Sequence, residues 1–291
     1  MSLPDIPPLD VPALLRRHGL KPDKRLGQNF LQDPEVLHSI TQAAGLHPDD
    51  TVLEIGPGLG SLTRCLAAAA REVVAVELDA ALLPPLRSVL KPYPNVRIVE
   101  GDILKLSPHE LVNRPGYIVV ANIPYYITSA IIRHLLEAAV KPRRIVLTIQ
   151  KEVAQRICAA PGDLSLLALS VQVYGKPEIM HVIPAAAFYP APNVDSAVLS
   201  IEIHPESLIA PALLPTFFRL IKAGFSQKRK TLRNSFAGGL HIKPADAESL
   251  LRQSGIDPMR RAETLSIPEW EVLSAQLAAG SNSSKNEDAH G

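Results

Sequence analysis

The sequence is poor in the residues that mark metal-binding and disulfide-linked proteins. Its two cysteines, Cys65 and Cys158, lie in apolar segments and have no CxxC spacing. This argues against a disulfide framework and a cysteine-bound metal, and it favours a reducing cytoplasm. The nine histidines are scattered, with no HExxH or comparable cluster. We therefore expect a cytoplasmic protein that binds no metal ion.

Long apolar runs and a secretion signal are missing as well. No segment approaches the roughly 18 consecutive apolar residues of a membrane span. The N-terminus, MSLPDIPPLD, has acids and prolines where a signal peptide has a basic region and an apolar core. At 291 residues the chain is about twice the length of a typical domain. We expect one large or two unequal domains, and no membrane contact.

Charge is nearly balanced in total but uneven along the chain. Between Pro215 and Phe236 there are six basic residues and no acidic one: Arg219, Lys222, Lys228, Arg229, Lys230 and Arg233. The segment Lys21–Phe30 adds three bases against one acid. Such blocks are compatible with a phosphate-binding face. A charge run of this kind is, however, more often only a solvated surface.

Short β-branched runs alternate with helix-like segments in the first half of the chain. The runs are TVLEIG (51–56), EVVAVE (72–77), VRIVEG (96–101), YIVVAN (117–122) and RIVLTI (144–149). This alternation predicts an α/β fold with a mostly parallel sheet and helices on both faces. The later run DSAVLSIEI (195–203) alternates polar and apolar residues, as an edge or antiparallel strand does.

Beyond the composition break HPESLIAPALLP (204–215) the patterns are helical. They are TFFRLIKAGF (216–225), KRKTLRNSF (228–236), ADAESLLRQSG (245–255) and IPEWEVLSAQLAA (267–279). The segment GSNSSKNEDAHG (280–291) is low in apolar residues and is expected to be disordered. The chain should therefore end in a smaller helical domain and a tail.

A glycine-rich loop, EIGPGLGSLT (54–63), lies between the first predicted strand and the first helix. Gly56, Gly58 and Gly60 permit a sharp turn and a close approach of a ligand. The spacing GxGxG differs from the dinucleotide fingerprint GxGxxG, and such a loop alone is a weak signal. A purely structural tight turn remains an equal alternative at this point.

Acids after the next two strands strengthen the ligand interpretation. Glu77 ends the second strand, 21 residues after Gly56, where an acidic side chain accepts hydrogen bonds from ribose hydroxyls. Asp102 follows the third strand, where a carboxylate can accept from an adenine amino group. Either acid alone is more often a solvated strand end or a helix cap. Together they predict a nucleoside-containing ligand, and the combination resembles the class I methyltransferases that use S-adenosylmethionine.

The segment NIPYY (122–126) follows the fourth predicted strand. Turn chemistry explains Asn and Pro but leaves Tyr125 unexplained, and the segment resembles the [ND]-[IL]-P-[FY] motif of amino-methyltransferases. The Asn122 oxygen and the Ile123 carbonyl are suited to accept the two hydrogens of an adenine amino group. This aims the nitrogen lone pair at the methyl group and stabilises the charge that develops. Pro124 stiffens the turn, and Tyr125 can stack on the base.

Six segments in this order resemble the bacterial small-subunit ribosomal RNA adenine dimethyltransferases, members of the rRNA adenine N6-methyltransferase family. They are GQNFL (27–31), EIGPGLGSLT (54–63), GDIL (101–104), NIPYYIT (122–128), FYPAPNVDSAV (188–198) and AGFSQKRKTLRNS (223–235). The resemblance implies the S-adenosylmethionine-dependent dimethylation of two neighbouring adenosines in the 3′-terminal hairpin of 16S RNA. It further implies the product S-adenosylhomocysteine, a 30S assembly intermediate as partner, and a monomeric enzyme.

The resemblance also implies roles for individual residues. Asn29 and Leu31 help to enclose the cofactor, and the other cofactor-binding positions are Gly56, Gly58, Glu77, Asp102 and Asn122. Phe188 stacks on the target adenine opposite Tyr125, although its sequence context alone suggests a core aromatic beside a turn. The catalytic set is Asn122, Pro124, Tyr125 and Phe188. The implied domains are an N-terminal arm (1–25), a catalytic domain (26–206), an RNA-binding helical domain (207–279) and a tail (280–291).

Two departures from the family pattern keep alternatives open. Ile123 stands where bacterial members more often have Leu, and the Erm group of 23S RNA methyltransferases commonly carries Ile there. Against Erm stand Pro57–Gly60 and the segment FSQKRKTLRNS (225–235). Tyr126 stands where many relatives carry Asn, and its side chain need not face the base. A non-catalytic RNA-binding assembly factor is the alternative from a different class.

Overall fold

The computed structural model describes residues 6–227 and 229–287, and the backbone alone for 281–287. The chain forms two compact units. Unit 1 comprises Met1–Gln155 and Lys176–Ile203, and unit 2 comprises Arg156–Gly175 and His204–Gly291. The segment Arg156–Gly175 thus clusters with the helical C-terminal residues, although the expected catalytic domain ran through it. The linear domain boundaries given above stay a prediction.

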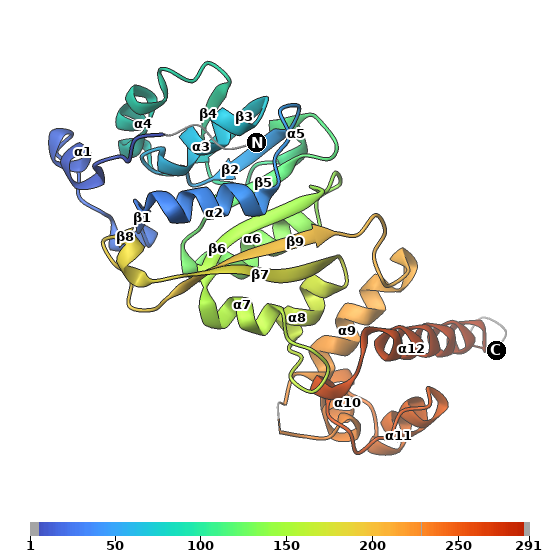
Figure 1. Cartoon of the computed structure of the whole chain (residues 1–291). Coiled ribbons are helices and arrows are strands. Elements are labelled where there is room, and N and C mark those ends of the chain that lie inside the picture. The colour runs from blue at the N-terminus through green and yellow to red at the C-terminus, as the bar shows by residue number, and fades with distance from the viewer. Residues whose placement is uncertain (1–5, 228, 288–291) are drawn as a thin grey trace. The chain divides into compact units, whose positions relative to one another are not determined.

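Unit 1 is built on a seven-stranded sheet with the strand order β4-β3-β2-β5-β6-β9-β7 (Figure 1). Its parallel part consists of β2 (Thr51–Ile55), β3 (Glu72–Glu77), β4 (Val96–Glu100), β5 (Ile118–Asn122) and β6 (Arg144–Gln150). All five strands lie where the β-branched runs predicted them. The predicted α/β class with a mostly parallel sheet is therefore confirmed.

The antiparallel alternative given for residues 195–203 is confirmed, and the edge alternative is not. β9 (Ser196–Ile203) pairs antiparallel with β6 but lies between β6 and β7, so it is not an edge strand. The edge strand next to β9 is β7 (Gly175–Ile183). The sequence did not predict this strand, because GKPEIMHVI contains Gly, Pro and Lys. A separate two-stranded sheet joins β1 (Phe30–Leu31) to β8 (Phe188–Tyr189).

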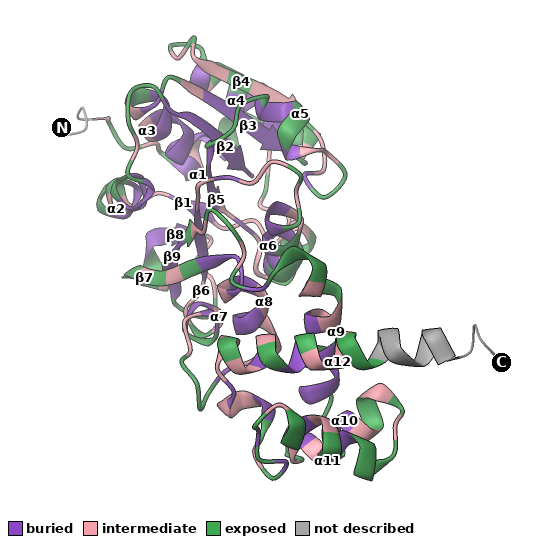
Figure 2. Ribbon diagram, turned by 90° about the vertical axis from the view of Figure 1, so that its right-hand side faces the viewer, coloured by how far each residue is buried: buried purple, intermediate pink, exposed green. Residues whose placement is uncertain are grey.

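The helices predicted after the strands are present in unit 1, together with three that the sequence did not predict (11–17, 34–44 and 108–112). In chain order the helices are α1 (Val11–Arg17), α2 (Pro34–Ala44), α3 (Ser61–Ala69), α4 (Leu83–Leu90), α5 (Pro108–Val112), α6 (Thr128–Leu136) and α7 (Lys151–Ile157), whose last two residues belong to unit 2. Apolar residues of α2 and α3 pack on β2, β3, β5 and β6 in one buried cluster. Consecutive residues 118–121 of β5 are fully buried, and because they point alternately to opposite faces, both faces of the sheet are covered. Figure 2 shows this buried centre in purple.

Unit 2 is helical, as expected for the C-terminal domain. Its helices are α8 (Leu166–Gln172), α9 (Leu214–Gly224), α10 (Leu232–Leu240), α11 (Pro244–Gln253) and α12 (Ile267–Glu287). The fully buried Trp270 contacts the rings of Phe225 and Phe236 at centroid distances of 6.3 and 6.2 Å. A Cβ at Gly224 would lie 2.9 Å from the Trp270 ring, so only glycine lets α9 approach this closely.

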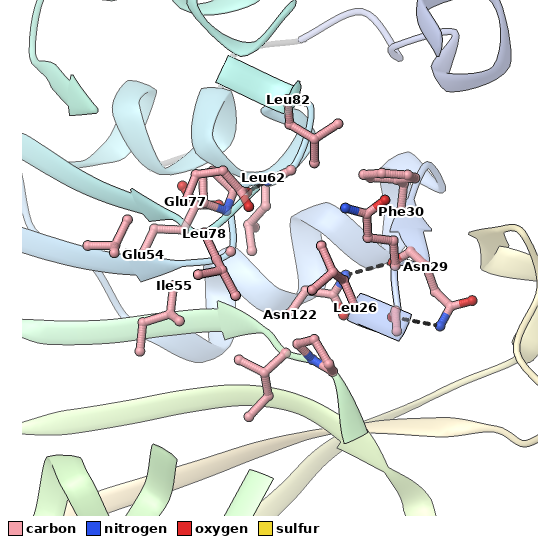
Figure 3. Close-up of a pocket in the computed structure, with 18 of the residues that line it drawn as sticks. Leu26, Asn29, Phe30, Glu54, Ile55, Leu62, Glu77, Leu78, Leu82 and Asn122 are labelled. Atoms are coloured by element: carbon pink, nitrogen blue, oxygen red, sulfur yellow. Dashed lines mark hydrogen bonds between the residues drawn. The ribbon is translucent and has the colours of Figure 1, made fainter. Parts of the chain in front are cut away.

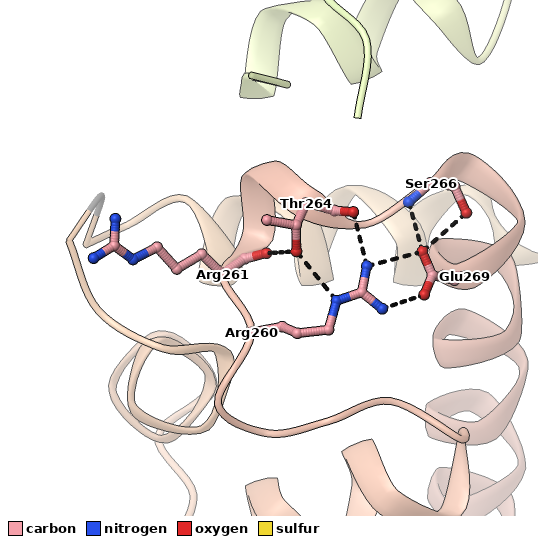
Figure 4. A network of polar contacts seen from close by, with 5 residues as sticks. All are labelled: Arg260, Arg261, Thr264, Ser266 and Glu269. Atoms are coloured by element: carbon pink, nitrogen blue, oxygen red, sulfur yellow. Dashed lines mark hydrogen bonds and ion pairs between the residues drawn. The ribbon is translucent and has the colours of Figure 1, made fainter. Parts of the chain in front are cut away.

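A polar network holds the start of α12 (Figure 4). The Arg260 guanidinium donates to the Glu269 carboxylate and to the Thr264 carbonyl. Glu269 also accepts from the backbone N–H and the hydroxyl of Ser266, at 2.8 and 3.0 Å. The hydrogen bond from Arg260 holds the pKa of Glu269 below its usual value. Each group in the network therefore has its partner within the chain.

Two expectations about the C-terminal half need adjustment. α10 begins only at Leu232, so Arg229 and Lys230 lie in the loop before it, and Lys228 lies outside the described residues. α12 continues to Glu287, so residues 280–287 are helical where disorder was expected, and 288–291 lie outside the described residues. Low apolar content removes packing partners but does not interrupt backbone hydrogen bonding along a helix. In the described part of the chain, no helix is long and apolar enough to cross a membrane.

Candidate active site

A cavity of about 1150 Å³, counting space open to solvent, lies in unit 1 at the carboxyl ends of β2, β3 and β5 (Figure 3). This is the edge at which open α/β sheets bind ligands. Every site residue proposed from the sequence lines this cavity: Asn29, Leu31, Gly56, Gly58, Glu77, Asp102, Asn122, Pro124, Tyr125 and Phe188. The fold therefore brings together residues separated by up to 159 positions, from Asn29 to Phe188.

The glycine loop takes backbone conformations that other residues avoid. Gly56 and Gly58 have φ angles of 70° and 59°, in the left-handed region that favours glycine. A Cβ at Gly58 would also lie 3.1 Å from the ring of Phe30. Gly58 is thus needed for two reasons: it takes the backbone conformation of the turn, and it lets Phe30 pack closely against the loop.

Glu77 closes this loop from the end of β3. Its carboxylate accepts from the backbone N–H of Gly58 at 2.9 Å and of Asp79 at 2.8 Å. The side chain is 6% exposed, and this burial raises the pKa of Glu77, while the two N–H donors oppose the rise. The carboxylate is held in one orientation at the cavity wall, and each oxygen keeps a second lone pair for a ligand.

Asp102 follows β4 at the same edge. Its Oδ1 accepts from the N–H of Leu104 at 3.0 Å, and its Oδ2 lies 3.7 Å from the Lys105 ammonium. A turn role is thus present, but Asp102 caps no helix, because the N-cap of α5 is Ser107. Asp102 also lines the cavity, so its contact with the cofactor stays a prediction.

Asn122 is oriented by the N-terminal segment. Its Nδ2 donates to the Asn29 carbonyl at 3.1 Å, and the Asn29 Nδ2 donates to the Gly27 carbonyl at 3.2 Å (Figure 3). Only the amide nitrogen can donate to a carbonyl oxygen, so this hydrogen bond identifies the atom that faces Asn29 as Nδ2 and the other as Oδ1. The oxygen Oδ1 is left as an acceptor at the cavity.

The two aromatic residues of the proposed catalytic set, Tyr125 and Phe188, are 63 positions apart in the sequence. The Tyr125 hydroxyl is 2.7 Å from the hydroxyl of Ser196 on β9, and burial raises the pKa of this phenol. Phe188 lies on β8 opposite Leu31 and is 4% exposed. Both rings border the cavity, and their role in stacking on a base stays a proposal.

Glu54 is a cavity residue that the sequence did not single out. It lies on β2, is 1% exposed, and its Oε2 has no hydrogen-bond partner among the described residues. Burial raises the pKa of Glu54 to about 8; the Thr63 hydroxyl opposes the rise, and the nearby Glu77 carboxylate adds to it. An acid inside the apolar run TVLEI was the available signal, because charged residues are almost never fully buried without a partner.

Gln28 is a second residue that the sequence reasoning missed. Its Nε2 donates to the Asp79 carboxylate at 2.6 Å, and its Oε1 accepts from the N–H of Asp23 at 2.8 Å. It therefore ties the N-terminal segment to the turn that carries Glu77. Nothing in the sequence indicates a contact across 51 residues.

The cavity lining carries three carboxyl groups, those of Glu54, Glu77 and Asp102, and none of the described lining residues is Lys, Arg or His. Such a site suits a ligand with positive charge and hydroxyl or amino donors. Within the described residues, no group of three or more His, Cys, Asp or Glu side chains is arranged to hold a metal ion.

Residues 19–277 match the family model described as ribosomal RNA adenine dimethylase. A protein named ribosomal RNA small subunit methyltransferase A from Dehalococcoides mccartyi is 48% identical over 266 residues, 91% of each chain. Its namesake from Bacillus cytotoxicus is 41% identical over 274 residues, which cover 91% of this chain and 94% of that protein.

Two solved structures are similar over 86% of this chain. The 23S rRNA methyltransferase ErmE has a TM-score of 0.70 and 31% identity, and all of that chain is covered. A dimethyladenosine transferase from Plasmodium falciparum has a TM-score of 0.73 and 25% identity, with 98% of that chain covered. ErmE is less similar in sequence than the relatives named for the small subunit.

Proposed function

The chain belongs to the ribosomal RNA adenine dimethylase family, and from this premise we propose that it dimethylates the N6 amino groups of two adjacent adenosines in the 3′-terminal hairpin of small-subunit ribosomal RNA. The observation that carries the proposal is the orientation of Asn122. Its amide nitrogen is committed to Asn29, which leaves Oδ1 to accept from an amino group at the cavity.

The cofactor we propose is S-adenosylmethionine, which supplies an electrophilic methyl group and leaves as S-adenosylhomocysteine; no metal is part of the reaction. Its ammonium and sulfonium charges match a cavity with three carboxyl groups and no base. Glu77 would accept from the ribose hydroxyls and Asp102 from the adenine amino group. The buried Oε2 of Glu54, which has no hydrogen-bond partner among the described residues, fits a cationic part of the same molecule, because a positive group would favour the ionised form that burial disfavours.

The residues of the NIPYY segment would act on the target base. Asn122 Oδ1 and the Ile123 carbonyl accept the two N6 hydrogens, so the nitrogen lone pair points away from the ring plane. Positive charge that develops on the nitrogen then meets two oriented dipoles. Tyr125, anchored through Ser196, and Phe188 would hold the ring between them. The nitrogen loses a proton to water after transfer, so no general base is needed.

For its partner we propose the RNA of a 30S assembly intermediate, bound by a monomeric enzyme in the cytoplasm. Exposed bases in and after α9 support an RNA-binding role for unit 2: Arg219, Lys222, Arg229 and Lys230. Arg233, counted with them in the sequence, is instead 3.1 Å from the Glu248 carboxylate. Part of its charge is therefore used within the chain.

The test is incubation of the protein with radiolabelled S-adenosylmethionine and small-subunit particles whose RNA lacks this modification. Nuclease digestion should yield labelled N6,N6-dimethyladenosine from the small-subunit RNA. Label in large-subunit RNA instead would identify an Erm-type enzyme. Absence of label from both RNAs, with stable binding to the particle, would identify a non-catalytic assembly factor.

A further inference from the structure

Tyr126 lies at the rim of the cavity and faces solvent. It belongs to the single turn Tyr125–Ile127 and lines the cavity, yet it is 64% exposed. Its ring edge rests beside Gly27: a Cβ built at Gly27 would lie 3.4 Å from Tyr126 Cε1 and 3.1 Å from the Pro124 Cβ. The ring is thus supported on one edge and open on the solvent side.

Tyr125 and Tyr126 have different surroundings although they are neighbours. Tyr125 is bonded through its hydroxyl to the buried Ser196, whereas no hydrogen bond to the Tyr126 hydroxyl is found among the described residues. Successive side chains in a 3₁₀ turn point about 120° apart, so the two rings do not share one wall. The Tyr125 side chain is held at the wall of the cavity, whereas the Tyr126 ring faces solvent at its rim.

Positive charge lies on the segment that leads to Gly27, the residue beside this ring. Lys24 and Arg25 are exposed on the turn Lys24–Leu26, which leads directly into Gly27. Arg25 is paired with Asp23 at 2.8 Å, while Lys24 makes no ion pair within the described residues. Open aromatic rings that stack on bases, together with basic residues that contact the phosphates, are the features with which proteins hold unpaired nucleotides.

We propose that Tyr126 stacks on the base next to the adenosine that occupies the cavity. The inference rests on the proposed function, in which two adjacent adenosines are both substrates. When one base enters the cavity, its neighbour loses a stacking partner, and this loss opposes the extrusion. The Tyr126 ring replaces that partner, and Lys24 contacts the adjoining phosphate. Tyr126 is thus a positioning residue for the pair of adenosines, distinct from the residues that hold the reacting base.

The experiment measures kcat/KM for single methylation with small-subunit particles whose RNA is ligated from a transcript and a synthetic 3′ oligonucleotide. One adenosine of the pair is retained as the target. The other is replaced either by purine riboside, which keeps a stacking face but has no amino group to methylate, or by an abasic residue. Both placements of the target are made, and the wild type is compared with Tyr126→Ala and Tyr126→Phe.

With the purine neighbour, Tyr126→Ala should lower kcat/KM by about 5- to 100-fold, the range that stacking on one base supplies. Tyr126→Phe should stay within about twofold, because it keeps the ring. With the abasic neighbour there is neither a stack to lose nor a base for Tyr126 to hold, so the wild type and Tyr126→Ala should have nearly equal kcat/KM. Cofactor affinity should be unchanged throughout.

An equal loss from Tyr126→Ala with both neighbours would overturn the proposal, since the ring would then act on the target base or on the fold. An unaffected Tyr126→Ala would overturn it as well. Failure of the proposed function looks different, because the wild-type protein would then methylate neither adenosine in an unmodified particle.

Discussion

The carboxyl groups of Glu54 and Glu77 in the cavity and the Glu269 carboxylate of the α12 network have opposite electrostatic settings. Glu269 in unit 2 receives a guanidinium and Ser266 donors, and its pKa lies below the usual value. Glu54 and Glu77 in unit 1 receive no cation from the chain, and the pKa of each is raised by burial. In the first region the protein compensates its own charge. In the second no cation of the chain compensates the two carboxyl groups, so burial favours their protonated form, and a cationic ligand would favour their ionisation.

The largest effect we expect is the loss of turnover in Asn122→Ala. This change removes the oriented acceptor at the cavity, and loss of one preorganised dipole typically lowers kcat by about 100-fold or more. Initial rates of methyl transfer to undermethylated particles measure it. The melting temperature should stay near that of the wild type, and the affinity for S-adenosylmethionine should fall only modestly. Near-normal methylation by this variant would refute the proposed role of Asn122.

Glu77→Ala should weaken S-adenosylmethionine binding by about 1–3 kcal/mol, the usual loss for hydrogen bonds to a charged group. Isothermal calorimetry measures the affinity. The matched control is Glu72→Ala, at the opposite end of the same strand, which should bind the cofactor normally. If Glu77→Ala folds and binds as tightly as the wild type, Glu77 does not contact the cofactor.

Arg260→Ala should show the opposite pattern, a loss of stability without a loss of cofactor binding. Removing the cation leaves Glu269 without its main partner, and because both side chains are one-third exposed, we expect a cost of about 1–2 kcal/mol. Urea unfolding measures the change. Since the pKa of Glu269 is lowered on folding, its contribution is present at neutral pH and is lost as the pH falls through the folded pKa.

Arg252→Ala is the matched control for that change. Arg252 pairs with Glu248 on α11, but its side chain is 68% exposed, so its removal should cost under about 0.5 kcal/mol. Equal costs for the two arginine variants would mean that the α12 network is no more than a surface ion pair.

A further effect is the pH dependence that Glu54 introduces. Its pKa rises from an unfolded value near 4.5 to about 8, so the folded state retains a proton that the unfolded state releases. Stability should therefore fall as the pH rises between these values. A cationic cofactor favours the ionised carboxyl, so its affinity should increase toward pH 8, by less than about tenfold per pH unit.

Glu54→Gln should weaken the pH dependence of stability and that of cofactor affinity. Urea unfolding and calorimetry between pH 6 and 8.5 measure the two. Gln keeps the shape of the side chain but does not titrate. An unchanged pH dependence of cofactor binding in Glu54→Gln would show that Glu54 does not sense the cofactor's charge.

Sequence spacing predicted the parallel strands and the edge at which the cavity lies. The reason is local: β-branched runs form strands, and right-handed connections bring the carboxyl ends of successive strands to one edge. Gly56, Glu77, Asp102 and Asn122 each follow their own strand, so their convergence required no long-range information. The position of β9 inside the sheet was not predictable in this way, because its register depends on a partner strand elsewhere in the chain.

By itself, then, the sequence determined the fold class, the family and the residues that meet at the strand ends, because these depend on periodicity and on motifs read over a few neighbours. Only the tertiary structure decided the contacts between distant segments. Asn29 orients Asn122 across 93 residues, and Gln28 reaches Asp79 across 51. It also decided that, within the described residues, Oε2 of the buried Glu54 and the hydroxyl of the exposed Tyr126 have no hydrogen-bond partner. Whether a polar group finds a hydrogen-bond partner, or an aromatic ring a packing partner, depends on residues that are distant in the sequence and meet only in the folded chain.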